Sequence, residues 1–385
     1  MPKINMVVAN LLVLSASVAL CSALLLAYYV YRAIADPFPR TAVRLEGDFD
    51  FRADDEIGFV AREDSHTRRY LKDTDFSYHI YTDHRSARVN GPAEKTDDRV
   101  DLITVGGSYS RGHGMRNEES FTEKLKSLLD VRVANFALGS YGTTQSLQML
   151  ERNLDLDPKV IVYGFIEHHL VRNLNPCAPS FSPYCLVTSY VAFEDEDLAK
   201  PYVHRPQFEY FSWDLNRKFY QQIAMADKGV TLHDVLWKIR IDAYRLARSS
   251  VYRRSQSEAR QRAAIRFLIR EMAESTRSID ALLLVVYIPD YLTPSYEPSP
   301  PPALLDAIER EDVVLVDMSR ALLKHYADNP GQQLYLRDDD DHPNELAHTL
   351  IAQSIHETIV NGEGTRGRFG APGSHGRAMP ATSGQ

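Results

Sequence analysis

The sequence predicts an α/β protein: a three-layer α/β/α sandwich around a parallel sheet, preceded by one N-terminal transmembrane helix. Two observations carry this prediction. From Val100 onward, short apolar runs that suit buried strands alternate with helical stretches, which is typical of a parallel sheet covered by helices on both faces. Near the N-terminus, a long apolar run contains no charged residue. With 385 residues, the chain can form one large domain or two small ones with ample core.

The N-terminal apolar run covers residues 6–31 and predicts a membrane anchor. A helix rises about 1.5 Å per residue, so roughly 20 apolar residues span a bilayer core. A cleaved signal peptide would have a shorter apolar region that ends at a small-residue site, whereas here three leucines continue past Ala23. We therefore expect an uncleaved anchor, with the short end 1–5 in the cytoplasm.

The two cysteines outside the anchor, Cys177 and Cys185, lie in a proline-rich loop. We expect them to form a disulfide, with two free loop thiols as the alternative. A disulfide fits an oxidising compartment outside the cytoplasmic membrane. Basic residues lie on both sides of the anchor and do not orient it, so the expected extracytoplasmic, periplasmic location of the main domain depends on these cysteines.

The segment 32–98 is polar and predicts a membrane-proximal lead-in that packs on the main domain and carries no chemistry. Its short runs at 57–61 and 76–81 suit strands. The main domain is expected over 99–361, with a helical insertion at about 208–278. Its predicted strands are 101–105, 131–136, 160–165, 281–288 and 313–316, and its other predicted helices are 120–130, 144–154, 302–308 and 344–360. The Gly-, Pro- and Ser-rich tail 362–385 should be disordered.

The charge balance of the chain bears on whether it binds nucleic acid. The formal net charge is −8, and neither a basic stripe nor a basic tail interrupts the acidic balance. Because nucleic-acid binding needs a basic surface, we expect no nucleic-acid partner.

The stretch LITVGGSYSRGHG at 102–114 is the first candidate for chemistry. A buried strand runs into two glycines and then Ser108, which is the geometry that presents a hydroxyl at the carboxyl edge of a parallel sheet. Backbone N–H groups just after Ser108 would be free to stabilise an oxyanion. The plain alternative is that Ser108 is a polar residue at the start of a helix.

A second candidate lies near the carboxyl end, in RDDDDHPN. His342 precedes an amphipathic helix, and a carboxylate a few residues upstream could fix its tautomer for general-base work. We expect Asp339 in that role, with Asp340 as the second choice. The acidic run could instead cap the last helix or hold a divalent cation.

Two further polar blocks follow predicted strands. The loop after 131–136 contains Gly139 and Ser140, whose amides could point toward Ser108. The strand 160–165 is expected to continue into Glu167 and His168 at the ligand crevice of the sheet. His168 and His169 are not expected to bind one metal together, because adjacent residues on a strand point to opposite faces.

Taken in order, these blocks resemble the SGNH/GDSL hydrolase superfamily over roughly residues 97–360. The segment GGSYSRGHGMRNEESF is similar to the GDSFTxGxGVxxxxTF block of its envelope-associated, membrane-anchored branch, which acts on acylated polysaccharides. The resemblance implies a flavodoxin-like sandwich of the SGNH hydrolase type. It also implies that Ser108 is the nucleophile, His342 the base and Asp339 its orienting carboxylate. The amides of Ser108 and of a residue in the Gly139–Ser140 loop would form the oxyanion hole.

Three positions depart from the family pattern. Gly107 replaces an aspartate that braces the turn, and Ser140 replaces an oxyanion glycine. The family's third block corresponds to the segment that follows the strand 160–165, and its asparagine falls on Glu167 or His168, of which only histidine can donate a hydrogen bond. Losing one oxyanion donor typically costs roughly 10²–10³ in rate.

The resemblance therefore implies a membrane-anchored serine esterase that hydrolyses or transfers O-acyl or O-acetyl groups without a cofactor or metal. Its expected partners are an acylated envelope carbohydrate, the membrane and the envelope polysaccharide machinery. One alternative is a catalytically inactive protein of the same fold that binds polysaccharide or scaffolds an envelope assembly. Another is a metal-dependent hydrolase built on the acidic run 338–341 and nearby histidines.

Overall fold

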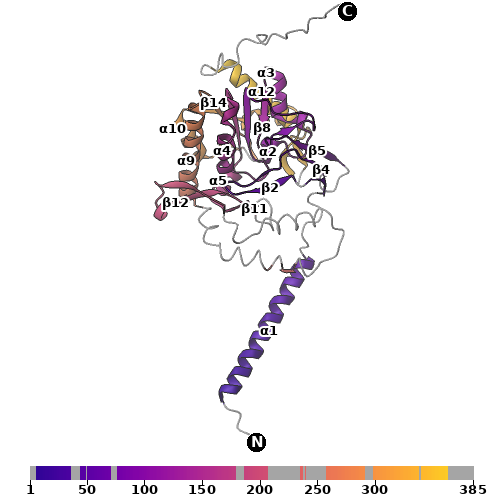
Figure 1. Ribbon diagram of the computed structural model, residues 1–385, viewed down its shortest axis with the longest axis vertical. Helices are drawn as coiled ribbons and strands as arrows, with labels where there is room; N and C mark the ends of the chain where they lie inside the picture. Colours follow the sequence, from indigo (N-terminus) through magenta and orange to yellow (C-terminus); the bar gives the residue numbers. More distant parts are fainter. Residues whose placement is uncertain are drawn as a thin grey trace, which may run out of the picture.

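A nine-stranded sheet forms the centre of the computed structural model, in the order β1-β4-β5-β6-β8-β7-β9-β14-β15 (Figure 1). The structure describes residues 6–35, 44–48, 50–70, 76–178, 186–206, 235–236, 239, 257–290, 298–337 and 340–362. Five neighbouring strands of the sheet run parallel: β8 (Val133–Asn135), β7 (Leu102–Gly106), β9 (Val160–Phe165), β14 (Leu282–Tyr287) and β15 (Val314–Asp317). These are the five strands that the apolar runs predicted.

The sheet continues beyond β8 with four antiparallel strands from the N-terminal part of the chain. They are β6 (Arg88–Val89), β5 (Ser77–Thr82), β4 (His66–Tyr70) and β1 (Arg44–Gly47). The sheet is therefore mixed rather than purely parallel. Short connections join β4, β5 and β6, and such connections allow only antiparallel pairing. The lead-in segment thus contributes strands to the same sheet as the α/β units.

Helices cover both faces of the sheet, which confirms the three-layer prediction. One face packs against α4 (Thr143–Glu151), α9 (Glu258–Arg277) and α10 (Pro302–Glu311), and the other against α3 (Phe121–Leu129), α11 (Met318–Asp328) and α12 (Glu345–Asn361). Side chains alternate between the two cores along each strand, so Ile161 faces the first core and Val162 the second. Both strand faces are buried, which explains why these strands read as continuous apolar runs.

The insertion expected at 208–278 is described only in part. Its end is α9, whereas residues 207–234 and 240–256 lie outside the described part of the chain. The predicted disordered tail lies outside it from residue 363 onward. The helix α11 was missed, because Asp317 both ends β15 and caps α11, leaving no loop to signal a new element.

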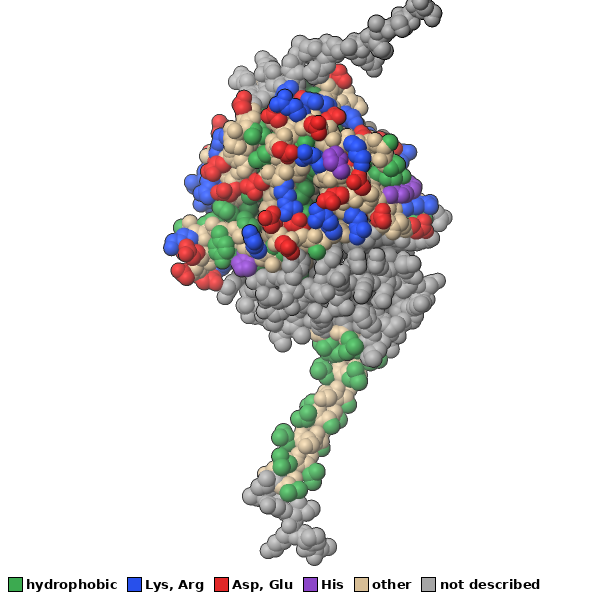
Figure 2. All heavy atoms as spheres, in the orientation of Figure 1, with side chains coloured by type: hydrophobic (Ala, Val, Ile, Leu, Met, Phe, Trp, Pro, Cys, Tyr) green, Lys and Arg blue, Asp and Glu red, His purple; other side chains and the backbone are tan. Residues whose placement is uncertain are grey.

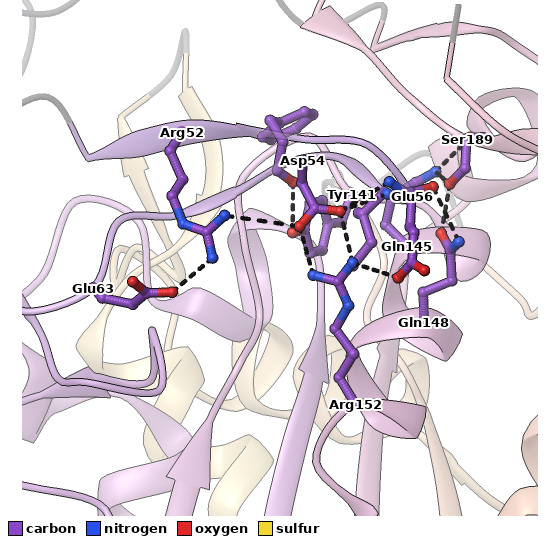
Figure 3. A network of polar contacts seen from close by, with 11 residues as sticks. Arg52, Asp54, Glu56, Glu63, Tyr141, Gln145, Gln148, Arg152 and Ser189 are labelled. Carbon is purple, nitrogen blue, oxygen red and sulfur yellow. Dashed lines mark hydrogen bonds and ion pairs between the residues drawn. The ribbon is translucent and has the colours of Figure 1, made fainter.

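A β-hairpin packs beside the parallel strands and is tied to α4 by ion pairs (Figure 3). It consists of β2 (Phe51–Asp54) and β3 (Gly58–Ala61). Arg152, the C-cap residue of α4, donates two hydrogen bonds of 2.7 Å to the Asp54 carboxylate and one of 2.8 Å to Glu56. The Tyr141 hydroxyl donates to the backbone carbonyl of Phe59 at 2.8 Å. The hairpin therefore supports the loop that leads from β8 into α4.

The N-terminal helix α1 spans Met6–Ala35. Its segment Val8–Arg32 has 25 residues with a mean hydropathy of 2.3, so it is long and apolar enough to cross a membrane. Figure 2 shows hydrophobic side chains exposed along this helix. A signal sequence would have the same properties, so the anchor itself stays a prediction.

Candidate active site

The turn after β7 presents Ser108 at the carboxyl edge of the parallel strands. Gly106 has φ of 147°, and a Cβ at this position would lie 2.8 Å from the backbone oxygen of Gly164. Only glycine fits this conformation and this close approach between neighbouring strands. Gly107 then precedes the short helix α2 (Ser108–Arg111), so Ser108 becomes the first residue of a single helical turn.

His342 lies on the short strand β17 (Asp340–Pro343), which pairs with β16 (Tyr335–Arg337) just before α12. Its Nε2 atom lies 2.8 Å from the Ser108 Oγ atom. The imidazole also packs against two rings of the first block, with centroid distances of 4.2 Å to His113 and 5.1 Å to Tyr109. The structure thus brings together the two residues that the sequence assigned to nucleophile and base.

The carboxylate that the sequence assigned to orient His342 is not among the described residues. Asp339 lies outside the described residues, as does the side chain of Asp340. Asp341 Oδ1 lies 3.6 Å from His342 Nδ1, which is too long for a hydrogen bond, and the Asp341 side chain is 45% exposed. The role of Asp339 stays a prediction.

The loop after β8 places Gly139 and Ser140 beside the Ser108 turn. Asn135 links the two, because its amide group donates to the Ser110 carbonyl at 3.1 Å and its oxygen accepts from Ala137 N at 3.1 Å. Ser140 is buried and has φ of 71°, the left-handed conformation that glycine adopts most easily. In the described part of the chain, no backbone carbonyl accepts a hydrogen bond from the amides of Gly139 or Ser140.

The third block differs from its prediction. The strand β9 ends at Phe165, and the chain turns at Glu167 into the helix α5 (His168–Arg172), so the expected strand end at 167–169 is wrong. Asn173 at the C-cap of this helix accepts from Thr143 N at 2.7 Å, which holds α5 against the start of α4. The strand therefore covers the predicted run 160–165, and its expected continuation into Glu167 and His168 is a helical turn.

This helical turn separates the two candidates of the third block. Glu167 accepts a 2.9 Å hydrogen bond from the Tyr287 hydroxyl and does not line the Ser108 cavity. His168 does line it, and its Nε2 lies 3.5 Å from Asp290 Oδ2. Of the two, only His168 is placed to reach a substrate.

The described residues contain no cluster of three or more metal-ligating side chains, whereas most of the acidic run 338–341 lies outside them, so the metal-dependent alternative is not tested there. His169 is fully buried, and its Nδ1 lies 2.8 Å from the Tyr163 hydroxyl. Burial, together with the nearby Arg172 guanidinium, holds the pKa of His169 well below its usual range. His169 is thus a neutral core residue, whereas His168 faces the cavity.

A cavity of about 340 Å³ opens over Ser108 and His342. Its lining includes Gly139, Ser140 and His168, and also four arginines that the sequence analysis missed: Arg69, Arg88, Arg111 and Arg172. Arg69 and Arg88 come from β4 and β6, in the segment where no chemistry was expected. No local sequence pattern marked Arg69 and Arg88, because these two residues reach the cavity only through pairing of distant strands.

Comparison with known proteins gives matches of fold alone. No family model and no curated protein matches the chain. Among solved structures, TesA is 14% identical and covers 68% of this chain and 98% of its own, with a TM-score of 0.36. A lipolytic protein of the G-D-S-L family from Desulfitobacterium hafniense is 12% identical, covering 67% of this chain and 99% of its own, with a TM-score of 0.31. A two-domain esterase active on acetylated mannans is 12% identical, covering 67% and 48%, with a TM-score of 0.35. Similarity at this level carries no argument about activity or substrate.

The structure describes one of the two cysteines of the predicted disulfide. Cys177 is disulfide-bonded, and Cys185 lies outside the described residues, so the pairing stays a prediction. Cys21 in α1 is a free thiol.

Chemically, the site combines a hydroxyl in contact with an imidazole, a loop of amides beside them, and a cavity above. An imidazole in contact with a hydroxyl can take its proton during attack on a carbonyl carbon. Amides that have no partner in the ground state can stabilise the oxyanion that forms.

Proposed function

We propose that this chain is a membrane-anchored serine esterase that hydrolyses or transfers O-acyl groups, with O-acetyl esters of a cell-envelope carbohydrate as the substrate class. The observation that carries the proposal is the 2.8 Å contact between Ser108 Oγ and His342 Nε2 at the carboxyl edge of parallel strands. Hydroxyl and imidazole groups in such contact form the core of acyl-transfer sites on many unrelated folds. The carbohydrate substrate rests on the sequence resemblance alone.

In the proposed mechanism, His342 Nε2 accepts the proton of Ser108 as Oγ attacks the ester carbonyl. The amides of Ser108 and of Gly139 or Ser140 stabilise the oxyanion, with His168 as a further donor. His342 then gives the proton to the leaving alcohol, which departs and leaves an acyl group on Ser108. Water or a sugar hydroxyl, deprotonated by His342, attacks that acyl group and restores the enzyme. Asp339 is proposed as the carboxylate that stabilises the imidazolium.

The test is hydrolysis of 4-nitrophenyl acetate by the full-length chain in detergent. Ser108→Ala should abolish turnover above background, because Ser108 carries the acyl intermediate in the proposed mechanism. Ser278→Ala, on the exposed end of α9, is the matched control and should hydrolyse as fast as the parent. Equal rates for Ser108→Ala and the parent would remove the proposed mechanism, and unchanged activity after chelator treatment would exclude the metal-dependent alternative.

An inactive polysaccharide-binding or scaffold protein is the second candidate function. The observation that favours it comes from the third block. Glu167 already accepts a hydrogen bond from Tyr287, and the remaining candidate donor to the oxyanion, His168, has a side chain that is 56% exposed. Labelling with a fluorophosphonate separates the two candidates, because the reagent modifies only an activated serine. A folded parent protein without an adduct on Ser108 would support the scaffold.

The proposed location of the main domain is the extracytoplasmic side of the cytoplasmic membrane. Support comes from the apolar helix α1 and from the disulfide at Cys177, a bond that is rare in reducing compartments. Maleimide labelling of unreduced cell-extracted protein should modify Cys21 alone. Labelling at Cys177 without prior reduction would contradict this location.

A further inference from the structure

An arginine cluster lines the cavity beside Ser108. It consists of Arg69, Arg88, Arg111 and Arg172, which are each between 3% and 7% exposed. They come from four different elements: β4, β6, α2 and α5. Arginine is rarely buried unless it is paired, so each member needs an account of its partners.

Three members of the cluster have structural partners. Arg172 donates to the backbone carbonyl of Tyr141 at 3.1 Å. Arg88 donates to the backbone carbonyls of Gly112, at 2.8 Å, and of Arg111 and Met115, which ties β6 to the turn after α2. Arg69 forms a buried ion pair with Asp50. These three arginines therefore hold the wall of the cavity together.

Arg111 is different, because Nη2, a terminal nitrogen of its guanidinium, has no hydrogen-bond acceptor among the described residues. This atom is buried, as is Nε, which also has no acceptor in that part of the chain. The carboxylate of Asp50 lies 3.8 Å from Nη2 and already pairs with Arg69. Leaving a buried charged donor without an acceptor is costly, which points to an acceptor that arrives from outside.

The charges around the cavity also favour an acceptor that arrives from outside. Within the described part of the chain, one carboxylate lines the cavity, that of Asp341, and Asp50 lies just behind the wall. Four arginines face these two acids and Asp290, whose Oδ2 lies 3.5 Å from Nε2 of the lining residue His168. Burial lowers the pKa of Arg111 and of Arg172 to about 10, so both stay protonated at neutral pH. The described lining of the cavity therefore carries more positive than negative charge.

We infer that the cavity binds an anionic group of the ester substrate, a carboxylate or a phosphate, with Arg111 as its main contact. A guanidinium matches both groups with two parallel hydrogen bonds. Ser108 and Arg111 are the first and last residues of α2, three positions apart, so their Cβ atoms are about 5–6 Å apart on one side of the turn. The anion would then lie within about one sugar ring of the acyl group. This inference rests on the proposed esterase function and narrows its substrate to acylated acidic sugars.

The test compares three phenyl acetates whose para substituents are a carboxylate, a phosphate and a neutral methyl ester. Full-length protein in detergent is assayed with 4-acetoxybenzoate, 4-acetoxyphenyl phosphate and the neutral methyl 4-acetoxybenzoate. The parent should show kcat/KM at least about 10-fold higher for one or both anionic esters, and the better of the two identifies carboxylate or phosphate. Arg111→Gln should remove this preference and Arg111→Lys should keep part of it. Arg310→Gln, on the exposed face of α10, is the matched control and should keep all of it.

The same charge preference in Arg111→Gln as in the parent would overturn the inference, as would a parent without any preference.

A second measurement keeps the test independent of catalysis and of the folding of one variant. Calorimetry on Ser108→Ala protein measures binding of sodium glucuronate, inorganic phosphate and glucose. Binding of an anion but not of glucose, lost when Arg111→Gln is added, supports the inference even where no ester is hydrolysed, so the esterase proposal would then fail alone. Ester hydrolysis that depends on Ser108, with no anion bound, overturns the anion site alone. If Arg111→Gln does not fold, glucuronate or phosphate must still inhibit the parent competitively, and the absence of inhibition by both anions would overturn the inference.

Discussion

His342 Nε2 lies 2.8 Å from Ser108 Oγ, although 234 positions separate the two residues along the chain. The contact joins the turn after β7 to the strand before α12, and the rings of Tyr109 and His113 pack on the imidazole. His342→Gln keeps a polar side chain here but cannot shuttle a proton, so we predict that kcat for 4-nitrophenyl acetate falls about 10²–10⁴-fold. His325→Gln, on the surface of α11, is the control. Equal losses in both variants would show that the effect is not specific to the site.

Ser140 stores backbone strain beside the proposed oxyanion hole. Its φ of 71° is accessible to serine but strongly disfavours a β-branched residue. We predict that Ser140→Gly leaves the melting temperature unchanged or slightly raised, whereas Ser140→Val destabilises the fold by about 1–3 kcal/mol. Thermal unfolding followed by circular dichroism checks this. Ser278→Val, at a residue with φ of −61°, should cost little, and an equal loss there would remove backbone strain as the cause.

The buried ion pair between Asp50 and Arg69 should matter far more than exposed pairs. Asp50 is fully buried, so Asp50→Asn leaves a buried guanidinium without its counter-charge. We predict a loss of about 3–5 kcal/mol in the free energy of unfolding. Glu63→Gln breaks the exposed pair with Arg52, whose side chains are 48% and 40% exposed, and should cost less than about 1 kcal/mol. Similar losses in the two variants would contradict the burial argument.

Asp290 gives stability a pH dependence. Burial raises the pKa of this carboxyl to about 6, with Glu167 and Asp341 adding to the effect and His168 opposing it. The unfolded chain loses this proton near pH 4 and the folded chain near pH 6, so stability falls as pH rises through that window. Asp290→Asn lacks this loss, and we predict that it gains roughly 2 kcal/mol over the parent between pH 4 and pH 7. Melting curves across that range test the sign, with the exposed Asp312→Asn as control. A constant difference across the window would contradict the prediction.

The sequence predicted the parallel core well, because strands buried on both faces are continuous apolar runs and need no long-range information. Val160–Phe165 was predicted residue for residue. The same reasoning overran this strand at Glu167 and His168, since short helices at a strand end carry no periodic signal of their own. Sequence reasoning also singled out Ser108 and His342, which lie in contact in the structure, because the glycine turn and the helix start beside them are local features.

The arginine cluster could not be predicted in this way. Arg69 and Arg88 lie on strands whose neighbours are set by pairing across the whole sheet, from β4 through β6 to β8. Arg111 is visible in the Ser108 block, but nothing in the sequence tells whether its side chain is solvated or buried. Its surroundings depend on residues about 60 positions upstream, such as Asp50.

Because the N-terminal strands belong to the same sheet as the α/β strands, a truncated chain is unsuited to identifying the natural substrate. A chain trimmed to begin at residue 99 would keep Ser108 and His342 but lose the wall that Arg69 and Arg88 provide. If the proposed function holds, such a fragment would cleave small activated esters but would have lost part of the anion site proposed to select the sugar. Screening of glycan libraries should therefore use the intact polypeptide, and a promiscuous fragment would say little about physiology.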